Sequence, residues 1–260
     1  MTRVIAWAVD PFVRVAAYIA DLSALFYESL RSLFTLQGRK VVFEATQRQV
    51  LFTGVEALPV MGLMAFILGA VVILQALTQL PKFGAEEAIG TVLVMVIIRE
   101  VGPLMTALMV VGRSGSAIAI ELGNMQVHDE ITAIEAMGIN PLHFLTAPRI
   151  IGVILSMVCL FLYFDLVAIA GGFLVAKWTL SIPIGRLLHS FAAGVSFADL
   201  TVGIVKCALN GIAISLICIY QGLEVKGSPT EVPQAATKAI VRSFIVCMVL
   251  NIFVTYLFYR

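Results

Sequence analysis

One uninterrupted apolar stretch, residues 60–80, constrains the fold more than any other feature, because it contains no charged side chain. A helix rises about 1.5 Å per residue, so a helix over this stretch covers the roughly 30 Å hydrocarbon core of a bilayer. Four further stretches are also long and strongly apolar, although each contains at least one charged residue, and they lie at about 87–112, 150–176, 200–222 and 240–259. The pattern predicts an all-α integral membrane protein with about five transmembrane helices.

The composition supports this fold class and excludes several others. Of the 260 residues, 60% are hydrophobic and 13% are charged, whereas a soluble domain carries about 25% charged residues. A water-soluble fold could not bury so much apolar surface. The net charge of +1 offers little attraction for nucleic acid, so we expect no nucleic-acid partner. The four cysteines lie in apolar stretches without metal-ligand spacing, so we expect no metal site.

The amino-terminal region differs from the apolar stretches that follow it. Asp10-Pro11 is a typical helix start, and polar residues then recur along one stripe of the predicted helix. Such a helix lies in the membrane interface, although a surface helix of a soluble domain shows the same pattern. A second amphipathic stretch covers about 40–57. We therefore expect interfacial amphipathic helices over residues 1–58, followed by a single five-span domain over residues 59–260.

Lysine and arginine in the connections predict the orientation, since positive charge is retained on the cytoplasmic side of a membrane. They are concentrated in the amino-terminal segment and in the connections between spans two and three and between spans four and five. The other connections and the carboxyl terminus hold only Lys82, Lys177, Arg186 and Arg260. We expect a cytoplasmic amino terminus and a carboxyl terminus on the opposite side.

Arg99 and Glu100 are the most informative residues, because they fall near the middle of the second predicted span. An ionisable group at mid-membrane costs roughly 2.5–3.5 kcal/mol on insertion scales unless it is paired or wetted. Neighbouring residues of a helix point about 100° apart, so the two side chains need not pair with each other. They could line a substrate cavity, or they could form structural ion pairs that join helices. Gly102-Pro103 would loosen the helix directly after them, which favours a cavity.

Two further ionisable residues lie inside predicted spans, Asp165 in the third and Lys206 in the fourth. Mutual pairing is the least costly way to bury an acid and a base in the same environment. We therefore predict that these two residues form a structural ion pair between the third and fourth spans.

Small residues recur at spacings of three and four at the end of the second span, at Gly112, Gly115 and Ser116. This spacing lets helices pack closely in lipid, and we expect a packing role. The same stretch contains Gly-Arg-Ser-Gly, which matches the serine motif of rhomboid-type intramembrane proteases. Such catalysis needs a histidine beside Ser114. All 3 histidines fall in polar connections, which disfavours a protease.

The chain contains no phosphate-binding loop of the form G-x-x-x-x-G-K-[ST], so we expect it not to bind ATP itself. Energy from ATP would have to come from a partner. A short polar helix at about 127–137 suits such a partner, because its first turn is acidic and its apolar residues share one face. We expect contact through Glu130, Ile131, Ala133, Ile134, Glu135 and Ala136. An interfacial helix without a partner is the alternative.

The run from Ile98 to Pro148, with the elements REVGP, GRSGSA and ELGNM intact, resembles the signature of the MlaE family of ABC permeases. That family works with MCE-domain proteins. Leu74-Gln75 fits the same pattern, and the resemblance extends loosely over nearly the whole chain. It implies the permease subunit of an ABC transporter that moves phospholipids or similar hydrophobic molecules between the inner membrane and the periplasm.

The resemblance also implies partners and residue roles. It implies a homodimer in the bacterial inner membrane, with an interfacial elbow helix, cytoplasmic ABC ATPase subunits that bind ATP and Mg, and a hexameric periplasmic MCE-domain protein. No cofactor would bind this chain. Arg99 and Glu100 would lie at the lipid cavity between two copies, Gln75 and Leu74 would line it, and the 127–137 helix would couple it to the ATPase. An ion-coupled secondary transporter is the alternative, although we find no internal repeat of the kind common in that class.

Overall fold

A computed structural model describes residues 22–25, 27, 39–83, 89–138, 141–180 and 194–259. Every regular element over these residues is a helix, and no strand occurs among them. Within these described ranges, 5 helices are long and apolar enough to cross a membrane. They cover Val42–Lys82, Gly90–Val127, Leu145–Trp178, Phe197–Leu223 and Pro229–Tyr259. The prediction of an all-α membrane protein with about five spans is confirmed.

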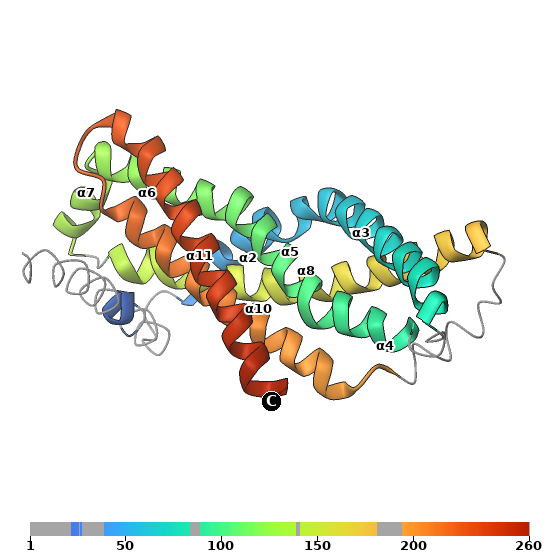
Figure 1. Cartoon of the computed structure of the whole chain (residues 1–260). Coiled ribbons are helices and arrows are strands. Elements are labelled where there is room, and N and C mark those ends of the chain that lie inside the picture. Colours follow the sequence, from blue (N-terminus) through green and yellow to red (C-terminus); the bar gives the residue numbers. More distant parts are fainter. Residues whose placement is uncertain are drawn as a thin grey trace, which may run out of the picture.

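The labelled helices of Figure 1 build these spans in chain order. The first span contains α2 (Arg39–Thr53) and α3 (Leu58–Gln79), and the second contains α4 (Ile89–Leu93), α5 (Gly102–Val110) and α6 (Ser116–Val127). The short α7 (Glu130–Ala136) follows, and the remaining spans are α8 (Pro141–Leu180), α10 (Phe197–Leu223) and α11 (Val232–Tyr259). Short 3₁₀ helices lie at Val55–Ala57, Leu80–Phe83 and Pro229–Glu231.

The predicted interfacial region is described only in part. The expected elbow helix, at about 11–37, lies outside the described residues except for a few helical positions. The second amphipathic stretch, 40–57, is largely α2, which leads into α3 through a turn at Gly54 and packs against α8. Gly152 of α8 permits this approach, because a Cβ there would lie 2.6 Å from the Cβ of Gln49. The division of the chain at residue 58 stays a prediction.

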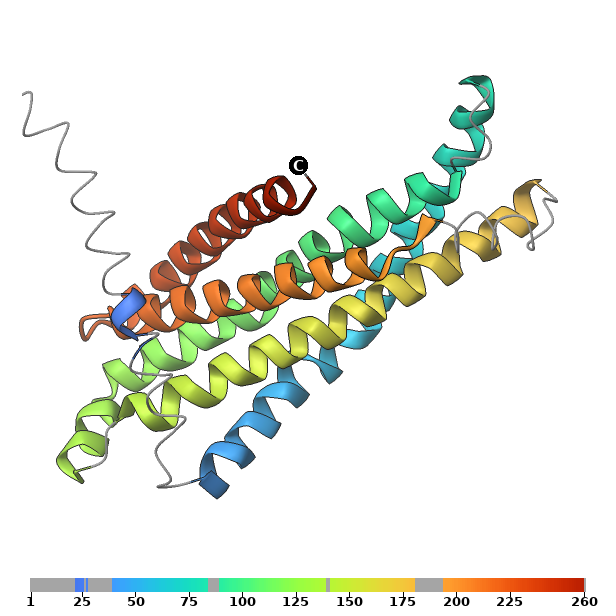
Figure 2. The same cartoon turned by 90° about the horizontal axis from the view of Figure 1, so that it is seen from below.

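The spans pack side by side in an order that differs from their order in the chain. Helix α3 packs along α8, α8 along α10, and α10 along α11, so that α3 and α11 lie on opposite sides of the bundle (Figure 2). In the most apolar part of each span, 67% of the residues are buried in the fourth span but only 28% in the first and 22% in the fifth. The outer faces of α3 and α11 are therefore left for lipid or for a partner.

Phe161 of α8 is fully buried at the centre of the bundle. Gly102 of α5 and Gly203 of α10 face its ring, and a Cβ at Gly203 would overlap it. Because these two positions lack side chains, one large ring fits between three spans.

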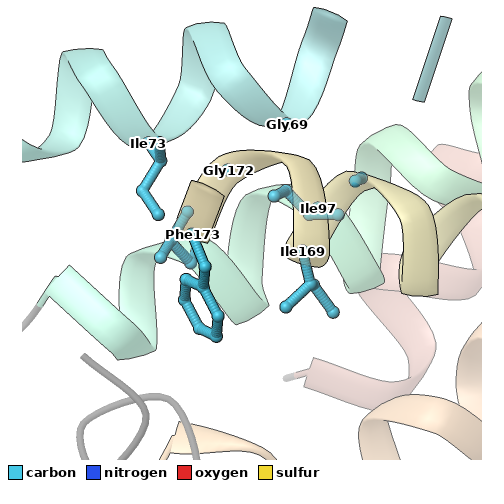
Figure 3. Close-up of a pocket in the computed structure, with 8 residues that line it drawn as sticks. Gly69, Ile73, Ile97, Ile169, Gly172 and Phe173 are labelled. Carbon is cyan, nitrogen blue, oxygen red and sulfur yellow. The ribbon is translucent and has the colours of Figure 1, made fainter. Parts of the chain in front are cut away.

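A second close approach joins α3 to α8. Gly69 of α3 lies so close that a Cβ there would overlap the carbonyl oxygen of Ala168. Figure 3 shows the small pocket beside this contact, with Ile73, Ile97 and Ile169 in its lining. No polar side chain lines it, so nothing there could orient a polar ligand. We interpret this pocket as part of the packing between the two helices.

The second span departs from regular α-helix in two places. The backbone forms π-helical turns over Val94–Val101 and Val111–Gly115. Pro103 explains the first, because it has no N–H and cannot donate to the carbonyl four residues earlier. The N–H of Gly102 bonds to the carbonyl of Ile97, five residues back, as in a π-helix. The loosening predicted at this point is present, and such turns are frequent at functional sites.

Candidate functional site

Arg99 joins the second span to the fourth and fifth. Its Nε lies 2.8 Å from Oδ1 of Asp199, in the first turn of α10, and its guanidinium lies 4.4 Å from the ring centre of Tyr259, at the end of α11. The Tyr259 hydroxyl donates to the same Asp199 oxygen over 3.1 Å. One carboxylate and one aromatic face therefore compensate the charge of Arg99.

Glu100 joins the same helices through different partners. Its Oε1 accepts hydrogen bonds from Lys206 Nζ over 3.1 Å and from Thr255 Oγ1 over 2.8 Å. Lys206 Nζ also donates to the backbone carbonyl of Arg99 over 2.6 Å. The Lys206 side chain is 0% exposed, so these two acceptors offset the loss of hydration around its charge. Arg99 and Glu100 bond to different partners, in agreement with their directions on the helix.

Pro103 leaves the Arg99 carbonyl free to accept this bond. In a regular α-helix, the N–H of residue 103 would donate to this carbonyl, but proline has no N–H. A carbonyl left without a donor in an apolar interior costs about 1–3 kcal/mol, and Lys206 supplies a donor at 2.6 Å. At the π-helical turn, Lys206 therefore replaces the backbone donor that Pro103 lacks.

The predicted ion pair between Asp165 and Lys206 is wrong. Lys206 is paired with Glu100, and neither carboxylate oxygen of Asp165 has a hydrogen-bond partner among the described residues. Asp165 is buried against Gly102, where a Cβ would overlap its Oδ1. The physical reason is that the π-helical turn offers Lys206 two acceptors, a carboxylate and a free carbonyl, at one place.

Arg99 lies in the first third of the helix that contains the second predicted span. This helix runs from Gly90 to Val127. The partners of Arg99 are in the first turn of α10 and the last turn of α11. These ion pairs therefore lie toward the end of the bundle opposite α7 (Figure 1).

The ionic side chains differ in exposure. The side chain of Arg99 is 23% exposed and that of Glu100 is 45% exposed, against 2% for Asp199. Both hydrogen bonds of Glu100 use Oε1, which leaves Oε2 open to a group outside the described part of the chain. A carboxylate this exposed on a membrane-spanning helix is costly unless it has a polar neighbour. The arrangement can hold a cationic or hydroxyl-bearing group at the surface of the bundle.

Leu74 and Gln75 lie on α3, away from the partners of the ionic pair. Leu74 is half-buried and Gln75 is exposed. No hydrogen bond or ion pair of the described residues joins them to Arg99 or Glu100, whose side chains bond to α10 and α11. Helix α3 packs against the π-helical turn Val94–Val101, and a cavity shared by these four residues stays a prediction.

The predicted partner-binding helix forms as α7 and lies at one end of the molecule, near the connection between α10 and α11 (Figure 1). Ile131 is buried and Ile134 is half-buried, so these two anchor α7 to the bundle. The other residues predicted to contact a partner are exposed: Glu130, Ala133, Glu135 and Ala136. Helix α7 thus presents two carboxylates and two small side chains outward.

The predicted packing residues divide into two groups. Gly115 is buried, and a Cβ there would lie 2.9 Å from Cys218 Sγ of α10, so this glycine permits a close helix contact. Gly112 is exposed, and a Cβ at this position would meet no described atom within 4 Å. The Ser116 hydroxyl donates to the Gly112 carbonyl over 2.6 Å. Of the two glycines, only Gly115 therefore packs tightly within the chain.

The serine of the protease-like motif is buried. Ser114 Oγ has no hydrogen-bond partner within the described part of the chain. The ring of His128 bonds to the carbonyl of Asn124, and His143 and His189 have side chains outside the described ones. The described residues also contain no group of three or more His, Cys, Asp or Glu that could hold a metal.

The sequence reasoning missed Asp199, Thr255 and Tyr259. A signal for Asp199 was present, because Ser196 and Asp199 stand at capping-box spacing, and Ser196 N–H donates to Asp199 Oδ2 over 3.2 Å. Nothing in the pattern distinguished Thr255 or Tyr259 from the other residues of the last span. Their roles depend on the packing of α11 against α10 and the second span.

Comparisons with known proteins agree with this architecture. The family described as Permease MlaE matches residues 46–257. The chain is similar to a probable ABC transporter permease protein of Rickettsia bellii, with 33% identity over 95% of each chain. It is also similar to the intermembrane phospholipid transport system permease protein MlaE of Haemophilus influenzae, with 29% identity over 82% of each chain.

A plant protein extends this set of relatives. Protein TRIGALACTOSYLDIACYLGLYCEROL 1, chloroplastic, of Arabidopsis thaliana is 29% identical over 79% of this chain and 59% of its own length. The family match covers most of the chain, and the Rickettsia protein is related over nearly its full length. The resemblance found in the sequence is thereby confirmed, and this chain belongs to the MlaE permease family.

Proposed function

We propose that this chain is the membrane-spanning subunit of an ABC transporter that moves phospholipids between the bacterial inner membrane and the periplasm, with ATP hydrolysed by separate subunits. Membership of the MlaE permease family carries this proposal. The Haemophilus influenzae relative is named as a phospholipid transport permease, which supports a phospholipid as the substrate class. The five membrane spans are consistent with a substrate that is itself held in the bilayer.

The lipid path of this proposal borders Arg99 and Glu100. Glu100 is fixed through Oε1 while the other side of its carboxylate is open. Because an exposed carboxylate in hydrocarbon is unfavourable, the open side needs a polar headgroup, water or a second copy of the chain beside it. A passage shared by two copies provides all three, and Leu74 and Gln75 would line it from the first span.

Helix α7 is the proposed contact with the ATPase. Its anchoring residue, Ile131, is buried, whereas Glu130 and Glu135 point outward. A short helix held rigidly at the end of the spans can transmit a movement of the ATPase to the bundle. The two carboxylates would pair with basic residues of that subunit, where ATP and Mg bind.

The proposed function also requires a defined orientation of the chain and several partner subunits. We place the amino terminus and α7 in the cytoplasm and the carboxyl terminus in the periplasm, from the distribution of lysine and arginine. Two copies of the chain would form the permease, with cytoplasmic ATPase subunits below and a hexameric MCE-domain protein on the periplasmic side. The apolar outer faces of α3 and α11 leave ample surface for a second copy and for lipid.

Reconstitution tests this function directly. The chain is purified with the proteins that accompany it in its native membrane, inserted into liposomes, and assayed for transfer of a fluorescent phospholipid with and without ATP. We expect transfer that requires both ATP and the ATPase subunit. Transfer by the chain alone, driven by an ion gradient, would show instead that it is a secondary transporter.

A further inference from the structure

A groove of about 440 Å³ lies between α2, α6 and α8, well away from the Arg99 and Glu100 pair. This basic groove is lined by Ala45, Arg48, Gln49, Phe52, Ala117, Ile118, Glu121, Leu145, Pro148 and Arg149. Its volume falls in the range of small-molecule sites, about 300–1,000 Å³. Its lining combines two guanidinium groups with apolar walls, a composition that suits an amphipathic anion.

Arg149 is the buried and structurally fixed arginine of this groove. Its side chain is only 10% exposed, and it is held by Glu121 Oε1 at 2.9 Å and by the Leu145 carbonyl, to which Nη1 donates over 2.6 Å. A guanidinium has five N–H donors, so donors remain after these two contacts. A planar guanidinium fixed in this way matches the oxygens of a phosphate group.

Arg48 supplies the second positive charge. It is exposed, lines the groove from α2, and has no ion-pair or hydrogen-bond partner among the described residues. Together with Arg149 it outweighs the single carboxylate of Glu121, which is itself 59% exposed and can turn toward solvent. The groove therefore carries a net positive charge with one cation uncompensated.

The groove lies where the membrane surface is expected. The third span begins at Leu145, and Arg149 follows one helical turn later. Helix α6 ends at Val127, so Glu121 lies near the end of the second span on the same side. The apolar side chains of Phe52 and Ile118 continue the groove toward the spans. An occupant with its anion at the two arginines would keep its apolar part in the bilayer.

We propose that the basic groove binds an anionic glycerophospholipid of the leaflet on the α7 side, with its phosphate on Arg48 and Arg149 and its upper acyl chains against the apolar wall. Basic pockets between membrane helices on the cytoplasmic side recognise anionic lipid headgroups in this way. The inference goes beyond the proposed transport path, because it requires only a bilayer and neither ATP nor a partner subunit.

Native mass spectrometry of the purified full chain tests this site. The protein is titrated with dioleoyl phosphatidylglycerol, with dioleoyl phosphatidylcholine and with inorganic phosphate. Each lysine or arginine near a membrane surface contributes about 1 kcal/mol to anionic lipid binding. We therefore expect Arg48→Ala to weaken phosphatidylglycerol binding about fivefold and phosphatidylcholine to bind more weakly than phosphatidylglycerol.

Two further variants distinguish binding in the groove from a general attraction of anionic lipid to the protein. Ala117→Trp fills the groove without changing its charge and should also weaken phosphatidylglycerol binding. Lys238→Ala removes an exposed positive charge from α11, which contributes no residue to the groove lining, and should leave binding unchanged. Equal loss in Lys238→Ala, or wild-type binding in both groove variants, would overturn the proposal. Displacement of the lipid by inorganic phosphate at similar concentration would overturn it too, since the site would then hold a free anion.

These outcomes are separable from those of the proposed transport function. Lipid binding is measured at equilibrium without ATP, so a failure of transport leaves the result unaffected. Conversely, an Arg48→Ala protein that loses lipid binding but still transfers phospholipid would support the groove as a site distinct from the transport path.

Discussion

The ammonium of Lys206 donates a hydrogen bond to the main-chain carbonyl of Arg99 over 2.6 Å, and the same ammonium is paired with the side chain of the next residue, Glu100. The backbone of the second span and its ionic side chains are therefore fixed by one buried group on the fourth span. Because Pro103 leaves that carbonyl without its helical donor, the direction of Glu100 depends on Lys206.

Replacing Lys206 with methionine should strongly destabilise the protein. The change leaves the Arg99 carbonyl without a donor and the Glu100 carboxylate without its cation, and breaking a buried pair costs about 3–5 kcal/mol. Thermal unfolding in detergent, followed by size-exclusion chromatography with fluorescence detection, measures the loss. Lys177→Met, at an exposed position of α8, is the matched control. A Lys206→Met protein as stable as the wild type would contradict the arrangement.

Restoring the missing backbone donor should affect transport more than stability. Pro103→Ala returns an N–H that can bond to the Arg99 carbonyl and regularise the π-helical turn. Each residue of a helix turns by about 100°, so Arg99 and Glu100 would point in new directions. We expect a clear loss of lipid transfer in liposomes. The new backbone hydrogen bond offsets part of the loss of the Lys206 contacts, so the melting temperature should fall less than in Lys206→Met. Wild-type transfer by this variant would show that the turn has no functional role.

The ring and the hydroxyl of Tyr259 should each contribute separately to the stability of the protein. Tyr259→Phe keeps the aromatic face near Arg99 but loses the hydrogen bond to Asp199, at a cost of about 1 kcal/mol. Tyr259→Leu also loses the cation–π contact, which adds about 0.5–2 kcal/mol. Thermal stability should therefore fall from the wild type to Tyr259→Phe and further to Tyr259→Leu. Equal stability of both would mean that the ring contact contributes nothing.

Much of the fold could be predicted because apolar periodicity and length depend only on local sequence. The uncharged stretch 60–80 coincides with Leu58–Gln79 to within two residues at the start and one at the end, and the short helix near residue 130 is α7. Pro103 correctly indicated an irregular helix. The helix of the second span continues past residue 112 to Val127, and within this continuation Arg113 pairs with Glu56 of the 3₁₀ turn Val55–Ala57.

The partners of the ionic residues could not be predicted in the same way. Helical pattern gives the face of each side chain but not the rotation and depth of one span against another. Asp165 and Lys206 are opposite charges on neighbouring spans, yet Lys206 bonds to the turn that contains Glu100. Thr255 joins this site only because α11 packs on α10 and on the second span.

The α7 carboxylates should control the response of the ATPase. Glu130→Lys and Glu135→Lys place positive charge on the surface proposed to meet basic residues, so the reconstituted complex should hydrolyse ATP with weaker stimulation by lipid. Thr132→Lys adds a lysine at an exposed position of the same helix without removing a carboxylate and should have a smaller effect. Unchanged hydrolysis and transport in both glutamate variants would count against the contact.

The Glu100→Gln variant in the complete transporter, compared with Glu44→Gln on the exposed face of α2, tests whether the Glu100 carboxylate borders the lipid path. The amide keeps the size of the side chain, and its oxygen can still accept from Thr255 and Lys206. Because Lys206 loses its counter-ion, we expect a lower melting temperature, and folded protein is selected by size-exclusion chromatography before the comparison. Phospholipid bound to the purified complex and ATP-driven phospholipid transfer are measured on the same preparations. The account predicts that both fall in Glu100→Gln and not in Glu44→Gln. Wild-type lipid content together with wild-type transfer in Glu100→Gln would contradict it.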